Sequence, residues 1–218
     1  MRLLWDSRGG RRVPSARAFD QAVSRLRRGE LERICELNRY GPIYFIPTRP
    51  FLRALARFFG RRRVLEVAAG DGHLARELAK LGVKIVATDS GKWERPQARM
   101  NPAEKRRFRG RRVPGLRLGE NVLRKDAIDA IRELEPDVVL ACWIPPGPLL
   151  GRIIREANRV IEIGAGSGIT GDIRCWRYPH EFLEDLDALG RCRLDERPAR
   201  KLHTRVTLYE RPASRRRR

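Results

Sequence analysis

The segment from Val64 to Ser90, VLEVAAGDGHLARELAKLGVKIVATDS, constrains the fold more than any other part of the sequence. An apolar run ends at Val67 and passes directly into the glycine-containing loop Ala68–Gly72. Leucines spaced for one buried helix face follow, and a second apolar run ends on Asp89. This order of strand, loop, helix and strand predicts a parallel sheet that binds a ligand at the carboxyl ends of its strands.

Apolar runs and helical patterns continue to alternate along the chain. We expect strands at 121–124, 136–143, 159–164, 191–199 and 205–212, and helices at 15–38, 48–60, 127–135, 149–158 and 179–189. The last two strands have no helix between them, so they should form an antiparallel pair at one edge of the sheet.

The sequence carries a large positive charge. Lys and Arg total 48 against 27 Asp and Glu, which gives a formal net charge of +21, and all but six of the 48 are arginine. Such a field attracts polyanions, and arginine binds phosphate with two parallel hydrogen bonds. RNA is therefore an expected partner, through the arginine-rich residues 105–112 around Phe108 and the basic tail. The alternative is compositional, because GC-rich codons or a hot habitat also favour arginine over lysine.

Metal and membrane chemistry have little support in the sequence. The four cysteines and three histidines are scattered, without the paired spacing of a zinc site, so no metal site is predicted. No apolar run approaches the roughly 18 residues of a membrane span, and the first residues lack the apolar core of a signal peptide. We expect a cytoplasmic protein with no membrane partner, and no oligomeric state is predicted.

Two classes of nucleotide-binding domain fit the first glycine loop. Residues 70–75, GDGHLA, match the G-x-G-x-x-A signature of dinucleotide-binding Rossmann domains, and Asp89 stands where an acid accepts hydrogen bonds from ribose hydroxyls. A nicotinamide-dependent oxidoreductase is therefore one alternative. Against it, Glu66 lies inside the first strand, where a buried acid needs a partner. Asp126 follows the third strand, where an acid can accept a hydrogen bond from an adenine amino group.

Three segments together resemble the class I S-adenosylmethionine-dependent methyltransferases: residues 64–90, RKDA at 124–127 and PDVVLACWIPPG at 136–147. The resemblance extends over residues 63–210 and implies an α/β fold, a Rossmann-like seven-stranded, mostly parallel sheet with an antiparallel last strand. It also implies S-adenosyl-L-methionine as the cofactor. Carried over by position, the contacting residues would be Glu66, Gly70, Asp71 and Gly72 at the methionine portion, Asp89 at the ribose, and Asp126 and Ala127 beside the adenine.

Three regions are expected along the chain. Residues 1–60 would form an N-terminal helical extension, residues 61–212 the domain that binds S-adenosylmethionine, and residues 213–218 a basic tail. The aromatic residues Tyr40, Tyr44 and Phe45, next to Pro47, would either form a lid over the pocket or simply pack the extension on the sheet.

The loop after the fourth strand is the expected substrate side. Residues 142–147, CWIPPG, resemble the [D/N/S]-P-P-[Y/F/W] loop of methyltransferases that modify amino groups, but Ile144 occupies the polar position and a glycine the aromatic one. Isoleucine cannot accept a hydrogen bond from an amine, so neither a general base nor another catalytic residue is assigned. Trp143, Pro145 and Pro146 are candidates for the acceptor pocket. Alternatively, the loop only ends a strand and starts a helix.

A second glycine loop repeats the pattern of the first. In residues 160–172, VIEIGAGSGITGD, Glu162 precedes two glycines with the spacing that Glu66 has in the first copy. No helix and no acid-terminated strand follow directly, so we interpret the second copy as a look-alike beside the acceptor. Its Asp172 is a further candidate for the substrate pocket.

The sequence therefore predicts an S-adenosylmethionine-dependent methyltransferase, with RNA or another polyanion-associated substrate favoured. The alternatives are a small-molecule or protein methyltransferase, and a non-catalytic module of the same fold that binds RNA.

Overall fold

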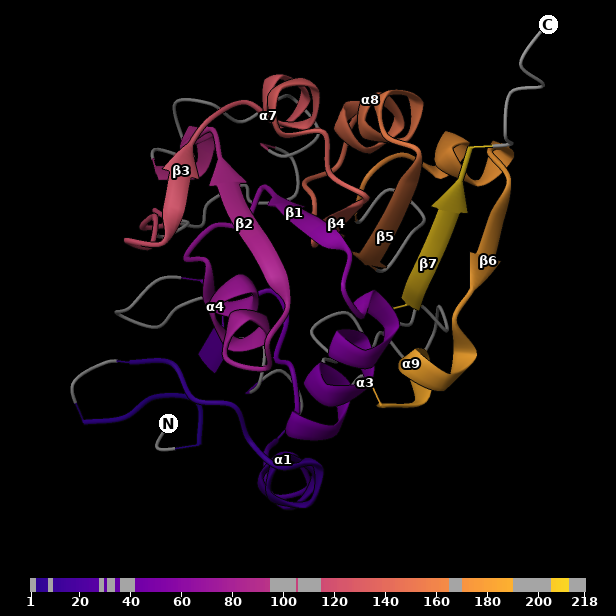
Figure 1. Cartoon of the computed structure of the whole chain (residues 1–218). Helices are drawn as coiled ribbons and strands as arrows, with labels where there is room; N and C mark the ends of the chain where they lie inside the picture. The colour runs from indigo at the N-terminus through magenta and orange to yellow at the C-terminus, as the bar shows by residue number, and fades with distance from the viewer. Residues whose placement is uncertain are drawn as a thin grey trace, which may run out of the picture.

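The computed structural model describes residues 3–7, 10–27, 30, 34–35, 42–94, 105, 115–164, 170–189 and 205–211. In Figure 1 the sheet crosses the middle of the molecule, with α7 and α8 on one side and α3, α4 and α9 on the other. Among the described residues, no helix is both long and apolar enough to cross a membrane.

A seven-stranded sheet forms the centre of the fold. Its strands are β1 Arg63–Val67, β2 Lys84–Asp89, β3 Val122–Arg124, β4 Val138–Cys142, β5 Arg159–Gly164, β6 His180–Phe182 and β7 Arg205–Glu210. Their order is β3-β2-β1-β4-β5-β7-β6, and β7 runs antiparallel to both of its neighbours. Strands β1 to β5 pair in parallel. The predicted fold, a seven-stranded and mostly parallel sheet with an antiparallel last strand, is confirmed.

Helices cover both faces of this sheet. The covering helices are α3 Arg49–Phe59, α4 His73–Ala79, α7 Ala127–Leu134, α8 Leu149–Glu156 and α9 Glu184–Leu189. The remaining elements are α1 Ala16–Val23 and the short 3-10 turns η1 Lys92–Glu94 and η2 Ile173–Arg177. Apolar side chains of α7 and α8 form one core with the sheet, and those of α3, α4 and α9 form the other. Residues 138–141 of β4 are buried in both cores, as their continuous apolar run indicates.

Two predictions about secondary structure are wrong. The helix expected at 179–189 begins only at Glu184, because residues 180–182 pair with β7 as the edge strand β6. Tertiary pairing has overridden the local pattern here. The helix expected at 15–38 is not continuous: α1 ends at Val23, residues 24–27 are not helical, and the described residues 30 and 34–35 are helical again. The strand expected at 191–199 lies outside the described residues; the strand that β7 pairs with on its outer side is β6, so β7 is an inner strand.

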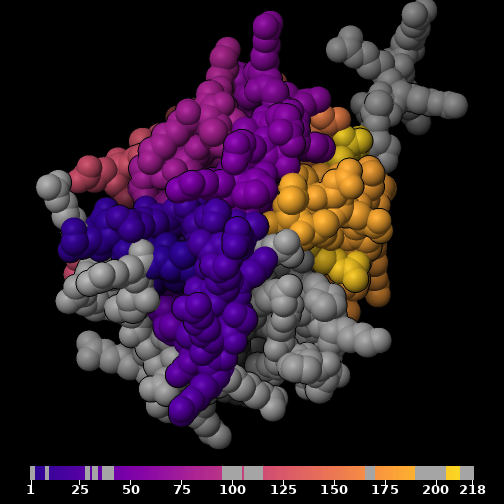
Figure 2. All heavy atoms as spheres, turned by 90° about the horizontal axis from the view of Figure 1, so that it is seen from below, coloured from indigo at the N-terminus to yellow at the C-terminus, as the bar shows by residue number. Residues whose placement is uncertain are grey.

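The N-terminal residues pack in two places. Leu4, Trp5 and Phe19 form a small cluster with Ile43 and Ile46 that is separate from the main cores. By contrast, α3 places four buried side chains in the core that it shares with the sheet. Figure 2 shows the N-terminal residues, in indigo, as a strip across the face seen from below. The division into residues 1–60 and 61–212 stays a prediction, and the tail 213–218 lies outside the described residues.

Candidate functional site

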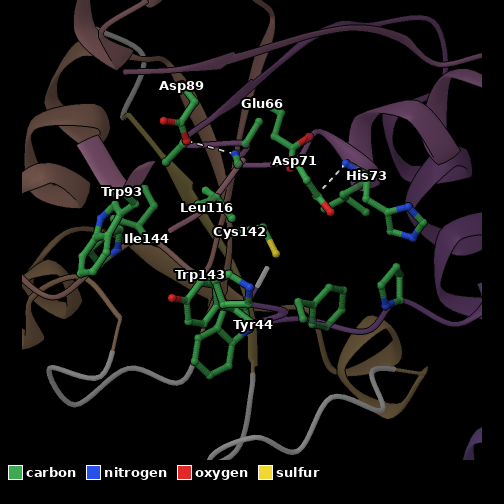
Figure 3. A pocket seen from close by; sticks show the side chains of 18 of the residues that line it. Tyr44, Glu66, Asp71, His73, Asp89, Trp93, Leu116, Cys142, Trp143 and Ile144 are labelled. Carbon is green, nitrogen blue, oxygen red and sulfur yellow. Dashed lines mark hydrogen bonds between the residues drawn. The ribbon is translucent and has the colours of Figure 1, made fainter. Parts of the chain in front are cut away.

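A cavity lies at the carboxyl ends of β1, β2 and β4, where the parallel order of the strands brings three loops together. It encloses about 1060 Å³ of space, part of it open to solvent. Figure 3 shows Asp89, Glu66 and Asp71 on one side of it and Trp143 with Tyr44 on the other.

The first glycine loop forms one wall in a conformation that needs glycine. Gly70 and Gly72 have φ of +59° and +64°, and a Cβ on Gly72 would lie 2.5 Å from Cγ2 of Val122. Ala68 also adopts a left-handed φ, at 52°, although it carries a Cβ. A non-glycine residue held there stores strain, a feature that is concentrated at ligand sites.

Glu66 lies in β1 and is buried, with 2% of its surface exposed. Its Oε2 accepts a hydrogen bond of 2.9 Å from the backbone N–H of Ala75 in α4. Burial raises the pKa of Glu66 to about 8, against the lowering effect of that hydrogen bond. The carboxyl group is therefore mostly protonated at neutral pH and would ionise beside a cation.

Asp89 ends β2 and holds two backbone groups. Its Oδ2 accepts from Gly70 N at 3.0 Å and its Oδ1 from Gly91 N at 2.7 Å. Each carboxylate oxygen keeps a second lone pair for a ligand hydroxyl. The same side chain thus fixes the glycine loop and lines the cavity.

Some predicted cofactor residues lie outside the cavity wall. Glu66, Gly70, Asp71 and Asp89 line it, but Gly72, Asp126 and Ala127 do not. Asp126 is the N-cap of α7, where its side chain accepts from Ile128 N at 2.9 Å. It remains close to the site, because the next residue toward the N-terminus, Lys125, donates its backbone N–H to the carbonyl oxygen of Asp89 at 3.0 Å.

The loop after β4 forms the opposite wall. Trp143, Pro145 and Pro146 line the cavity as predicted, together with the fully buried Ile144. Trp143 has a left-handed φ of 54°, which is rare for a bulky residue, and its backbone N–H donates to Ile163 O at 2.8 Å. Its indole stacks on the Tyr44 ring, with centroids 6.5 Å apart and an interplanar angle of 18°. This wall is apolar and aromatic.

Asp172 does not reach the cavity. It is the N-cap of η2, where it accepts from Arg174 N at 2.9 Å. Its neighbour Gly171 instead supports the substrate loop: Gly147 N donates to Gly171 O at 2.9 Å, and Gly171 N donates to Ile144 O at 3.2 Å.

Glu162, the acid that precedes the second glycine loop, has a structural role. Glu162 is 3% exposed; its Oε1 accepts from Thr170 Oγ1 at 3.2 Å and its Oε2 from the Tyr209 hydroxyl at 3.1 Å. Burial raises the pKa of Glu162 to about 7, while these two hydrogen bonds lower it. The glycines themselves, within 165–169, lie outside the described residues. Glu162 therefore joins β5 to β7 and to Thr170.

The sequence pattern missed several residues that line the cavity. They are Arg11, Pro42, Ala68, Ala69, His73, Leu74, Trp93, Leu116 and Cys142. Arg11 lies within an arginine-rich stretch, so nothing in the sequence marks it. His73 could have been noticed, because it follows the glycine loop directly. Tyr44, Phe45 and Pro47, expected as a lid or as packing, line the cavity, while Tyr40 lies outside the described residues.

Three residues that line this cavity have a buried side-chain nitrogen atom that lacks a partner among the described residues. His73 Nε2, Trp93 Nε1 and Trp143 Nε1 are buried and make no hydrogen bond to any residue that the structure describes. A buried polar atom without a partner costs about 1–3 kcal/mol. A ligand with acceptor atoms would remove that cost.

The described residues contain no candidate metal site and include little of the segment expected to contact RNA. Within the part of the chain that the structure describes, no cluster of three His, Cys, Asp or Glu side chains could hold a metal ion. The arginine-rich residues 105–112 lie outside the described residues except for Lys105, which is exposed.

No protein-family model and no curated protein matches the sequence. Solved structures with a similar backbone fold include the bifunctional kinase-methyltransferase WbdD (16% identity, over 74% of this chain and 38% of that chain, with a TM-score of 0.42). TehB from Haemophilus influenzae is similar at 13% identity, over 75% of this chain and 62% of that one, with a TM-score of 0.39. Magnesium protoporphyrin IX methyltransferase from Synechocystis, with bound SAM, is similar at 13% identity over 73% and 76%, with a TM-score of 0.41. The chain thus spans less than two thirds of WbdD and TehB. Similarities this distant add nothing to the assignment of the fold, which follows from the strand order of the sheet.

Proposed function

We propose that the protein is an S-adenosylmethionine-dependent methyltransferase that acts on RNA or another polyanion-associated substrate. The observation that carries the proposal is the cavity at the ends of β1, β2 and β4. It joins the acids Glu66 and Asp89 and the glycine loop to the aromatic loop after β4. A cofactor half and an acceptor half thus share one enclosed space.

The residues present fit the cofactor. Asp89 has spare acceptor capacity for ribose hydroxyls, and Gly70 lets a ligand approach the backbone without a Cβ in the way. Two of the unpartnered nitrogen atoms, His73 Nε2 and Trp93 Nε1, can bind acceptor atoms of the cofactor, while Trp143 Nε1 belongs to the opposite, acceptor wall. When bound, S-adenosylmethionine supplies an activated methyl group on a sulfonium.

The chain's own contribution is then to orient the acceptor and exclude water. Tyr44, Trp143 and Pro146 enclose the cavity on the acceptor side, and Ile144 offers no side-chain hydrogen bond. An apolar wall of this kind favours a planar, weakly basic acceptor that is held in position rather than deprotonated. A nucleobase is such a group, and the net charge of +21 suits the phosphates that accompany it.

Calorimetric titration tests the cofactor part of the proposal. S-adenosylmethionine and S-adenosylhomocysteine should bind, and NAD should not; binding of NAD alone would favour the oxidoreductase alternative. Failure of all three ligands would favour a non-catalytic module.

Transfer of a labelled methyl group tests the acceptor part. Cell extracts of RNA, protein and small metabolites are each incubated with the protein and labelled cofactor, and label should enter the RNA fraction. Incorporation only into protein or metabolites would instead support the second candidate class. A steep loss of RNA affinity with rising salt should accompany the expected result, because phosphate contacts release counterions.

A further inference from the structure

At the glycine-loop end of the cavity, Arg11 forms an ion pair with Asp71 that the sequence did not indicate. An Arg11 Nη1 atom lies 2.9 Å from Asp71 Oδ2 and 3.2 Å from Asp71 Oδ1. Arg11 Nη2 donates to the carbonyl oxygen of Phe45 at 3.1 Å. A guanidinium has five N–H groups, so Arg11 keeps further donors for a ligand while the ion pair fixes its position.

His73 presents an N–H donor to the same end. Arg76 Nη2 lies 3.2 Å from His73 Nδ1, and since arginine only donates, Nδ1 is the acceptor of that hydrogen bond. Burial, with the nearby charges of Arg11 and Arg76, lowers the pKa of His73 to about 2, so the ring is neutral. The single ring proton is therefore on Nε2, the atom that has no partner among the described residues.

The charges at this end favour an anion next to His73. Two guanidinium groups act on the imidazole, and the Asp71 carboxylate is already paired with Arg11. The remaining acid, Glu66, is mostly protonated at neutral pH because burial raises its pKa to about 8. An anionic group near Arg11 and His73 gains hydrogen bonds, while a cation near Glu66 would ionise that acid. A zwitterion suits both positions.

We infer that Arg11 and His73 bind the α-carboxylate of the cofactor's amino-acid portion while Glu66 binds its α-ammonium group, an inference that rests on the proposed function. The N-terminal segment thus contributes directly to the cofactor site. Asp71 acts as a positioning residue, because its ion pair holds Arg11 at the glycine loop.

The test compares ligands in two pairs, each matched in its charge at sulfur and differing in the amino-acid portion. S-adenosylmethionine carries both charged groups and its decarboxylated form keeps only the ammonium, and both are sulfonium ions. S-adenosylhomocysteine carries both charged groups and 5′-methylthioadenosine carries neither, and both are neutral at sulfur. Calorimetry measures their affinities for the wild type, for Arg11→Gln and His73→Phe, and for Arg152→Gln, a matched control at an exposed arginine of α8. Thermal melting of each variant verifies that it is folded.

We expect the wild type to bind S-adenosylmethionine about tenfold or more tightly than decarboxylated S-adenosylmethionine, the effect of losing one charged hydrogen bond. Arg11→Gln and His73→Phe should remove this preference and leave the affinity for 5′-methylthioadenosine close to that of the wild type. Arg152→Gln should change nothing.

Two results would overturn the inference. One is equal weakening of S-adenosylhomocysteine and 5′-methylthioadenosine in the variants, which would indicate general damage to the cavity. The other is a wild type that does not discriminate between carboxylated and decarboxylated ligands, a result that needs no variant to fold. If the wild type binds none of the four ligands, the proposed function itself fails.

Discussion

Replacing Glu162 with glutamine should make the protein more stable at alkaline pH and leave it nearly unchanged at acid pH. Glu162 is buried between β5 and β7 and accepts hydrogen bonds from Thr170 and Tyr209. Burial raises its pKa from the ordinary 4.5 to about 7. The folded protein therefore keeps the proton on this group over a pH range in which the unfolded chain has lost it.

The sign follows from proton linkage. Between about pH 4.5 and 7 the folded state binds more protons at Glu162 than the unfolded state does, so the free energy of unfolding falls as pH rises through this window. The loss is complete above the folded-state value. The rise of the pKa of Glu162 from 4.5 to about 7 corresponds to roughly 3 kcal/mol. Glutamine has nearly the same shape and does not titrate, so Glu162→Gln removes this loss.

Urea unfolding of both proteins at pH 5 and pH 8.5 measures the effect. Subtracting the variant from the wild type at each pH cancels the contributions of other groups, including the raised pKa of Glu66. The difference in unfolding free energy should move by about 2–3 kcal/mol in favour of the variant between the two pH values. Parallel stability curves for the two proteins would refute the reasoning, because they would mean that Glu162 titrates normally.

Three further predictions concern the cavity. Ala68→Gly should raise the free energy of unfolding measured in urea by about 0.5–1 kcal/mol, because the left-handed φ of 52° strains alanine. The larger conformational entropy of glycine in the unfolded chain offsets only part of the strain that is relieved. An equal or lower free energy of unfolding in the variant would contradict this. Glu66→Gln should abolish the proton release that accompanies S-adenosylhomocysteine binding at pH 7, because the bound ammonium ionises a carboxyl group whose pKa is raised to about 8. Calorimetric titrations in buffers of different ionisation enthalpy measure the number of protons released. Unchanged proton release in the variant would argue against the contact between Glu66 and the ammonium. Trp143→Ala should slow methyl transfer on the order of tenfold to a hundredfold with little change in S-adenosylhomocysteine affinity; full turnover would show that the loop only connects β4 to α8.

The sequence predicted the elements whose signals are local. The apolar run of β4 and the loop between β1 and α4 are each encoded within a few adjacent residues, and the structure has them at the expected places. The placement of Glu66 and Asp89 at one cavity followed from the parallel order of their strands. Which of the predicted residues contact a cofactor stays a prediction.

What the sequence could not predict depends on contacts between distant segments. Strand β6 has only residues 180–182 and exists because β7 pairs with it, so no periodicity reveals it. Arg11 reaches Asp71 across 60 positions of sequence, and its neighbours are also arginines and glycines. Trp93 lines the cavity from a 3-10 turn that leaves no repeating pattern.

The inner position of β7 has a consequence for biosynthesis. β7 is made after every other described strand, yet it lies between β5 and β6 and pairs with both. While the chain is still emerging from the ribosome, the backbone groups of β5 that face β7 have no strand to pair with, and Tyr209 has not yet covered Glu162. Nascent chains stalled before residue 205 would therefore present an open sheet edge, the feature through which partly made proteins aggregate or recruit chaperones.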